Sequence, residues 1–286
     1  MAEARCPASC GEFIQGWIDG GEKLVSCPID WFSTVNVCES AMSYDERPRM
    51  RQMLERVVAH FGHPASFANS LSISLESTIP VGKGLASSTA DIAATAVATA
   101  RHLGQELDEP TLATLCVQIE PTDSTVFRKL TLFDHLNAQV QIACPMVPAL
   151  ELLLLEGNTT LLTEDYHRRN REPTLISSAE VLDNAWLRLQ RSCEQQDVRL
   201  LAEAATLSSV ASQQLLEKPM FNELLCLVEK FDLYGLNVAH SGSVVGLMLD
   251  SSKHDYQKVV WQIKKLAIDV HYPKQHLVTM IEGGVR

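Results

Sequence analysis

Residues 70–103 place a strand, a glycine-containing turn and a helix directly one after another. Apolar residues occupy every second position of "SLSISLEST", which predicts a strand over 70–78 with one buried face. The turn "IPVGKGLASST" follows, and residues 88–103 are helical by composition and end before Gly104. The chain must therefore fold so that a strand leads through a tight turn into the N-terminus of a helix.

Such a turn can bind an anion. Gly82 and Gly84 tolerate backbone angles that other residues avoid, so their N–H groups can converge with the unpaired N–H groups of the first helical turn. Ser87 and Ser88 add hydroxyls that can cap the helix, bind phosphate oxygens or ligate Mg²⁺. The alanines between Ala90 and Ala100 let another element or a nucleotide approach closely. The alternative is an ordinary glycine turn with a serine cap and a core helix.

Three well-known phosphate motifs fit this turn poorly. A Walker loop requires Ser or Thr after its lysine, and Lys83 is followed by Gly84. A dinucleotide fingerprint requires a third glycine where Ser87 stands, and an acidic strand end about 20 residues further on, where this chain is still helical. The HRD and DFG triplets of protein kinases are absent.

Strands and helices are mixed along the whole chain. Further strands are predicted over 12–18, 23–29, 32–39, 150–157 and 275–281, and a glycine turn that leads into a strand is predicted within 236–250. Further helices are predicted over 45–62, 108–120, 175–195, 197–216, 221–231 and 258–268, with Asp108 as an N-cap. The length favours two domains, 1–147 and 148–286, with a boundary near 145–149.

Composition excludes several classes of partner. The formal net charge is −11 and the acidic residues are scattered, so the sequence gives no sign of a basic surface that would bind nucleic acid. No apolar run is long enough to span a bilayer, so we expect a soluble cytoplasmic protein without a membrane partner. The eight cysteines form no CxxC pair, which favours reduced core thiols over disulfides; a metal or redox site at Cys6 and Cys10 is the alternative.

Three motifs together resemble the GHMP kinases. "PVGKGLASST" at 80–89 is similar to their PxxxGLxSSA phosphate loop, and "CPASCGEFIQG" and "AHSGSVVGLML" stand where the first and last family motifs are expected. The resemblance implies an α+β fold of two domains, N-terminal and C-terminal, with the active site between them. Ser9 stands near where many members carry a lysine, and the late motif has fewer glycines than usual.

A narrower resemblance concerns the substrate. "IEPTDSTVF", "TLFDH" and "LYGLNVAHSGSVVGLMLD" are similar to GHMP kinases that phosphorylate L-threonine for cobalamin biosynthesis. This implies transfer of the ATP γ-phosphate to the L-threonine hydroxyl, with Mg²⁺ as the cation and a homodimer among the expected assemblies. Homoserine or another small hydroxyl substrate is one alternative, and a non-catalytic ligand sensor is another; sensors usually lose the motif serines or the metal carboxylate, and both are present here.

The resemblance also implies roles for individual residues. The triphosphate is expected on the loop formed by Pro80, Val81, Gly82, Lys83, Gly84, Leu85, Ala86, Ser87 and Ser88. Ser88 is the expected Mg²⁺ hydroxyl and Ser87 caps or assists, while Lys83 either neutralises phosphate charge or is a solvated turn lysine. Glu120 is the expected metal carboxylate; otherwise it is a surface acid at a helix end.

Asp123 is the expected group that accepts or orients the substrate proton. An aspartate that caps the next turn is the alternative, and the resemblance also implies that some family members work without a base. Asp134 and His135 are rival candidates. In the late motif Gly242 and Ser243 are expected to approach phosphate or substrate; a buried turn is the alternative. Three further side chains can meet the substrate ammonium, and the sequence does not rank them: Glu12, Gln15 and Asp30.

Overall fold

A long antiparallel hairpin runs through the molecule. In a computed structural model, which describes residues 1–41, 43, 45–144, 150–159 and 171–286, strand β1 spans Ala2–Ile18 and β2 spans Gly21–Glu39. Asp19 and Gly20 both have positive φ, as a tight two-residue hairpin turn requires. The three short strands predicted over 12–39 are therefore wrong in extent. Pairing continues past Pro28, which pairs with Ser9, and register shifts on both sides of this pair absorb the irregularity.

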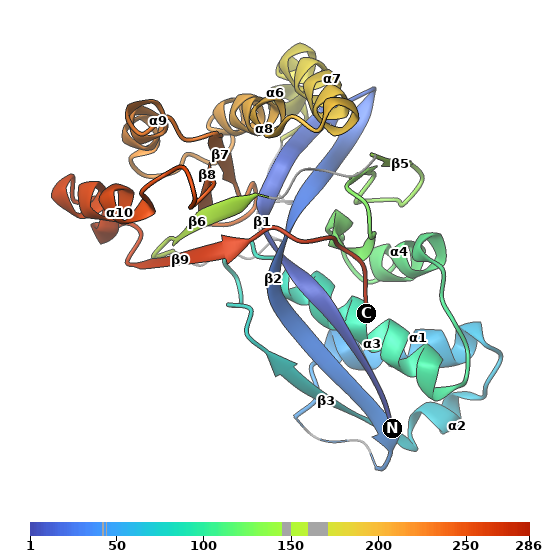
Figure 1. Cartoon of the computed structure of the whole chain (residues 1–286). Helices are drawn as coiled ribbons and strands as arrows, with labels where there is room; N and C mark the ends of the chain where they lie inside the picture. The colour runs from blue at the N-terminus through green and yellow to red at the C-terminus, as the bar shows by residue number, and fades with distance from the viewer. Residues whose placement is uncertain (42, 44, 145–149, 160–170) are drawn as a thin grey trace.

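The hairpin is the centre of one nine-stranded sheet with the order β5-β4-β2-β1-β7-β8-β6-β9, and β3 pairs with the other end of β2 (Figure 1). Every strand pair in the described residues is antiparallel. The remaining strands are β3 (Leu71–Ser77), β4 (Thr131–Phe133), β5 (Gln141–Ala143), β6 (Glu151–Glu156), β7 (Gly235–Val238), β8 (Val245–Leu249) and β9 (Lys274–Thr279). This is an α+β architecture, as predicted.

The helices form separate groups. In the lower body of Figure 1, α1 (Pro48–His60), α2 (Ala65–Ala68), α3 (Ser87–His102) and α4 (Glu109–Val117) lie beside the long hairpin. In the upper body, α6 (Glu172–Ser177), α7 (Ala179–Gln195) and α8 (Val198–Ser212) cover the other end of the hairpin, and α9 (Phe221–Lys230) and α10 (Tyr256–Lys265) cover β6 to β9. Two short 3₁₀ turns, η1 (Ser124–Val126) and η2 (Ile268–Val270), complete the elements.

Most predicted helices are confirmed within a few residues. Asp108 accepts a hydrogen bond from the Thr111 N–H, so the predicted N-cap of α4 is correct. The helix predicted over 175–195 is divided at Ser178 into α6 and α7, and the one predicted over 197–216 ends at Ser212. The predicted boundary at 145–149 lies outside the described residues. The division into 1–147 and 148–286 stays a prediction, and the sheet continues from β1 into β7.

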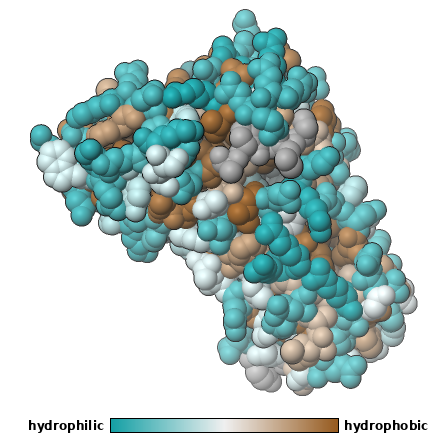
Figure 2. Space-filling view, in the orientation of Figure 1, coloured by the Kyte–Doolittle hydropathy of each residue, from teal (hydrophilic) through white to brown (hydrophobic). Residues whose placement is uncertain are grey.

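The alanine-rich helix α3 packs against protein. It contacts β1, β2 and α1, and its alanines are buried between these elements: Ala90, Ala93, Ala94, Ala96, Ala98 and Ala100. The small side chains thus allow close approach of the hairpin, which places the N-terminus of α3 beside residues carried by β1 and β2. Figure 2 shows a mostly hydrophilic face whose outline is indented on the left, where the upper body meets the lower one.

Candidate active site

The loop between β3 and α3 has the left-handed backbone that the sequence predicts. Gly82 and Gly84 have φ values of 72° and 83°, and Ala86 has a φ of 58°. Leu85 is buried, and its carbonyl accepts a hydrogen bond from the Ser9 N–H at 3.1 Å, which fixes the loop to β1. Val81 is 62% exposed. The loop therefore has an anchored end beside the helix and an open end at the surface.

The N-terminus of α3 is arranged differently from the sequence-based expectation. The helix begins at Ser87, its N-cap is Ala86, and no side chain caps it. Of the roles considered for these serines, helix capping is therefore wrong, because the left-handed Ala86 turns the chain into the helix without a side-chain bond. The assisting role of Ser87 stays a prediction. Ser87 and Ser88 belong to the first helical turn, where backbone N–H groups lack intrahelical acceptors and favour an anion.

The late turn at residues 239–244 supports the glycine loop from behind. A Cβ on Gly84 would lie 2.5 Å from the Ala239 Cβ, and a Cβ on Gly242 would collide with the Lys83 carbonyl. The Ser243 N–H donates to the Lys83 carbonyl at 3.0 Å, and the Ser243 hydroxyl donates to the Thr159 carbonyl at 2.8 Å. Gly242 and Ser243 thus form the buried turn of the alternative interpretation; direct contact with phosphate stays a prediction.

Lys83 connects the glycine loop to the second half of the chain. Its ammonium donates to the carbonyls of Gly157 at 2.8 Å and Thr159 at 3.1 Å, and it lies 4.0 Å from the Glu156 carboxylate. The side chain is 13% exposed. It is therefore not a solvated turn lysine, and whether it also neutralises phosphate charge stays a prediction.

The two expected metal ligands converge on one arginine. The Arg49 Nη1, carried by the first turn of α1, lies 2.6 Å from the Glu120 Oε2 and 3.4 Å from the Ser88 Oγ. Helix α4 ends at Val117, so Glu120 lies beyond the helix rather than at its end, and its side chain is only 13% exposed. Sequence reasoning missed Arg49, since nothing in "ERPRMR" indicates contact with residues 39 and 71 positions away.

The donor set at this point fits a hard cation. A hydroxyl and a carboxylate are ligands that Mg²⁺ accepts, and Mg²⁺ normally completes its coordination with substrate phosphates and water. Within the described ranges no group of three or more His, Cys, Asp and Glu side chains is placed to hold a metal. Ser88 and Glu120 would thus supply two ligands of the ion, and nucleotide phosphates or water would supply the others.

Asp123 lies next to the same helical turn. Its Oδ2 accepts a hydrogen bond from the Thr89 hydroxyl at 3.0 Å, and its Oδ1 accepts one from the Ser26 hydroxyl at 3.4 Å. The residue precedes η1, but its side chain makes no cap bond, so the capping alternative does not hold. Although solvent reaches part of the side chain, burial and the charges of Glu12 and Glu120 raise the pKa of Asp123 to about 7.

The rival acids and bases have structural partners. Asp134 accepts hydrogen bonds from the N–H groups of Leu136 and Asn137 and so closes a local turn. His135 is buried 3.7 Å from the Glu22 carboxylate, which also pairs with Arg171 at 2.5 Å. The side chains of Asp134 and His135 are thus engaged in these structural contacts, and the His135 carbonyl accepts a hydrogen bond from the Thr122 N–H beside Asp123 at 3.1 Å.

Of the three residues considered for the substrate ammonium, Glu12 is the one that pairs in the sheet with Ser26, whose hydroxyl donates to Asp123. The buried Glu12 carboxylate accepts hydrogen bonds from the N–H and the Nδ1 of His240, both at 3.0 Å. By contrast, Asp30 accepts from the Thr279 N–H, and the Gln15 N–H donates to the Ser208 hydroxyl. Glu12 therefore joins β1 to the late turn.

Lys218 adds a buried cation on the other side of the late turn. Its ammonium donates to the Gly242 carbonyl at 2.8 Å, and desolvation lowers the pKa of Lys218 to about 7. Sequence reasoning missed this residue because Lys218 lies in a connection before α9, where a lysine is ordinarily solvated.

Six of the eight cysteines are buried, as expected for core thiols, whereas Cys38 is half-buried and Cys226 is exposed. Cys6 and Cys10 are buried in β1, and burial raises the pKa of both thiols, which makes them inert. Ser9, which stands near the lysine position of many family members, instead donates to the carbonyl of Cys27 and accepts from its N–H.

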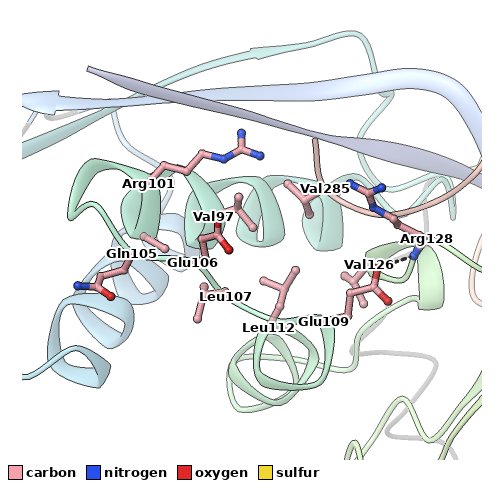
Figure 3. A pocket seen from close by; sticks show the side chains of 11 residues that line it. Val97, Arg101, Gln105, Glu106, Leu107, Glu109, Leu112, Val126, Arg128 and Val285 are labelled. Atoms are coloured by element: carbon pink, nitrogen blue, oxygen red, sulfur yellow. Dashed lines mark hydrogen bonds between the residues drawn. The ribbon is translucent and has the colours of Figure 1, made fainter.

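A cavity of about 270 Å³ lies away from these residues (Figure 3). Its apolar wall includes Val97 and Leu112, and charged side chains such as Arg101 and Glu106 stand at its edge. None of the predicted site residues lines it. In the described part of the chain, no helix combines the length and the apolar character of a membrane span.

Residues 49–127 match the family model described as the GHMP kinases N terminal domain. The chain is 57% identical over 285 residues to the L-threonine kinase of Citrobacter freundii, covering 100% of this chain and 99% of the relative. It is 59% identical over 286 residues to the L-threonine kinase of Salmonella typhimurium (strain LT2), covering 100% of this chain and 95% of the relative.

Among solved structures, the chain resembles the mevalonate diphosphate decarboxylase of Enterococcus faecalis, with a TM-score of 0.74 and 14% identity over 100% of this chain and 98% of that one. This likeness concerns the fold, and it confirms the architecture that the sequence motifs led us to expect.

Proposed function

The chain belongs to the GHMP kinase family, and we propose that it transfers the γ-phosphate of ATP to the hydroxyl of L-threonine, which yields O-phospho-L-threonine and ADP. Two relatives with L-threonine kinase activity in their names match it along its whole length, which supports this substrate over homoserine. The product would serve cobalamin biosynthesis, as the resemblance of the sequence implies.

The observation that carries the proposal is the gathering of three oxygen-bearing side chains around one helical turn. Ser88 stands in the first turn of α3, and one nitrogen of Arg49 contacts both Ser88 and Glu120. Asp123 accepts a hydrogen bond from Thr89, the next residue of that turn. Phosphoryl transfer depends on alignment and charge stabilisation, so a metal ligand pair and a proton acceptor beside a phosphate loop meet its main requirements.

In this proposal the glycine loop and the first turn of α3 hold the triphosphate through backbone N–H groups. Ser88 and Glu120 would hold Mg²⁺, which neutralises charge on the phosphates when bound. Asp123 accepts the proton of the substrate hydroxyl, because a base with a pKa near 7 is ionised and still basic at neutral pH. Glu12 is the buried acid best placed to meet the substrate ammonium.

Two other classes are less well supported. A ligand sensor would not need Ser88 and Glu120 to converge, yet they do. An oxidoreductase would need a strand with an acidic end about 20 residues after the glycine loop, and α3 occupies that segment.

The test is ADP release from Mg-ATP by the purified protein with L-threonine, D-threonine, L-serine, L-homoserine, galactose and mevalonate. We expect turnover with L-threonine above the other compounds. Preference for another alcohol would refute the substrate, and ATP binding without turnover on any of them would support a sensor.

A further inference from the structure

Arg49 touches both residues to which the proposed function assigns the metal. Its Nη1 lies 2.6 Å from the Glu120 carboxylate and 3.4 Å from the Ser88 hydroxyl, so one nitrogen bridges the pair. The guanidinium carries the positive charge that the ion would otherwise supply to Glu120. A guanidinium and a divalent cation repel each other at such distances and cannot both lie between the same two oxygens.

The neighbouring arginines explain why the backbone of Arg49 is fixed while its side chain can move. Arg47 pairs with Asp91, and Arg51 pairs with Glu46 and donates to the carbonyls of Ala68 and Leu71. These contacts hold the N-terminus of α1 against α3 and β3. The Arg49 side chain itself is 43% exposed, so it can leave Glu120 without disturbing the core.

The chemistry of arginine indicates where the side chain goes. Its planar fork of N–H donors suits phosphate oxygens and pairs with them bidentately. Arg49 already lies at the first turn of α3, where the loop and the unpaired backbone N–H groups favour an anion. A bound triphosphate would therefore offer the guanidinium new acceptors close to the ones it gives up.

We propose that Arg49 is a further residue of the phosphoryl-transfer site, which exchanges Ser88 and Glu120 for the phosphate oxygens of the nucleotide. Without nucleotide, Arg49 holds the hydroxyl and the carboxylate together and opposes metal binding. With the magnesium nucleotide bound, Arg49 pairs with the phosphates. The proposal rests on the metal roles given to Ser88 and Glu120 above.

The test measures binding rather than turnover. Mn²⁺ binding to the nucleotide-free protein is followed by electron paramagnetic resonance, and binding of metal-free ATP is followed by calorimetry in EDTA. For Arg49→Met we expect tighter Mn²⁺ binding, by a factor of about five or more, and ATP binding weakened about tenfold, the loss of one charged hydrogen bond. Arg49→Lys keeps the charge and should recover part of both affinities.

The matched control is Arg56→Met on the same helix, because Arg56 donates to the Gln118 side chain and touches none of these groups. It should leave both affinities within about twofold of the wild type. An Arg49→Met protein that binds Mn²⁺ no more tightly than the wild type, or ATP no more weakly, overturns the proposal.

The same measurements separate the proposal from its premise. Ser88→Ala and Glu120→Gln should both weaken Mn²⁺ binding in the presence of ATP. If neither does, the assignment of the metal ligands is wrong, whatever Arg49→Met shows. Neither assay contains threonine, so an error in the substrate does not affect the result.

Discussion

At the scale of the single residue, Asp123 titrates near neutrality because its surroundings penalise its charge. Burial has the largest effect, and the charge of Glu12 adds to it, against hydrogen bonds from Thr89 and Ser26 that favour the carboxylate. We expect kcat/KM to rise as the pH increases through about 7 and to level off above it, because only the ionised form accepts a proton. Asp123→Asn should lower kcat at pH 8 by about 100-fold and remove this rise.

A rate profile shows whether a base is used at all. Near-normal kcat in Asp123→Asn, with the same dependence on pH as the wild type, would mean that the phosphate takes the proton itself. Glu109→Gln is a suitable control, since Glu109 is the first residue of α4 and accepts a hydrogen bond from the Arg128 N–H rather than from the partners of Asp123.

The raised pKa also fixes the sign of a stability effect. The folded pKa of about 7 lies above the unfolded value of 3.8, so the folded state binds the proton more tightly. The contribution of Asp123 to the free energy of unfolding therefore falls as the pH rises from about 4 to about 7. Asp123→Asn should raise the melting temperature at pH 8 and change it little near pH 4, by calorimetry; equal shifts at both pH values would contradict the raised pKa.

At the scale of the element, the site depends on two turns that touch through their backbones. Gly84 has a φ of 83°, and an added Cβ would meet Ala239 and Gly242. Gly84→Ala should therefore displace the loop and raise the KM for ATP by about tenfold or more. Gly104→Ala is the matched control, because Gly104 has a φ of 70° with open space around it.

In both glycine variants an alanine at positive φ lowers the free energy of unfolding by about 1 kcal/mol. Only Gly84→Ala adds a collision of the new Cβ with Ala239 and Gly242. Equal KM values for ATP in both variants would show that contact between the turns does not position the loop. Thermal unfolding of each variant measures the shared cost.

The elements show what sequence patterns can and cannot predict. Helix α3 and strand β3 follow local periodicity and composition, and they were predicted almost to the residue. The convergence of Arg49 on Glu120 and the bond from Lys83 to Gly157 depend on how distant segments pack, which leaves no local pattern. Ala86 is a particular case, since alanine gives no signal for the left-handed cap it forms.

At the scale of the whole molecule, the β1–β2 hairpin belongs to both halves of the chain. Gly16 lies so close to α7 that an added Cβ would collide with Leu182. The Gln15 N–H donates to Ser208 of α8, and Glu12 pairs with Val238 of β7. The sequence patterns predicted three short strands over 12–39 instead of this long hairpin, because the length of a strand depends on partners far away in sequence. The motifs implied a site between two halves, which stays a prediction. The side chains gathered around Ser88 all come from the first half, and the late turn at 239–244 of the second half supports the glycine loop.

This shared hairpin makes a prediction about cooperativity. A fragment of residues 1–147 would leave the α7 and α8 side of β1 uncovered and expose apolar surface. We expect this fragment to be insoluble or unfolded, and the full chain to unfold in one calorimetric transition. A soluble fragment with its own cooperative transition would instead support independent domains at the expected boundary.

The homodimer also stays a prediction, which sedimentation of the full chain tests.

The central claim is that Ser88 and Glu120 act together at the phosphoryl-transfer site of an L-threonine kinase. The most direct measurement is phosphorus NMR of the products formed from Mg-ATP and L-threonine by the wild type, Ser88→Ala and Glu120→Gln. We predict a phosphomonoester signal from the wild type, and formation slower by about 100-fold or more in both variants, with melting temperatures close to the wild type. No phosphomonoester from the wild type, or equal rates in all three proteins, would contradict the account.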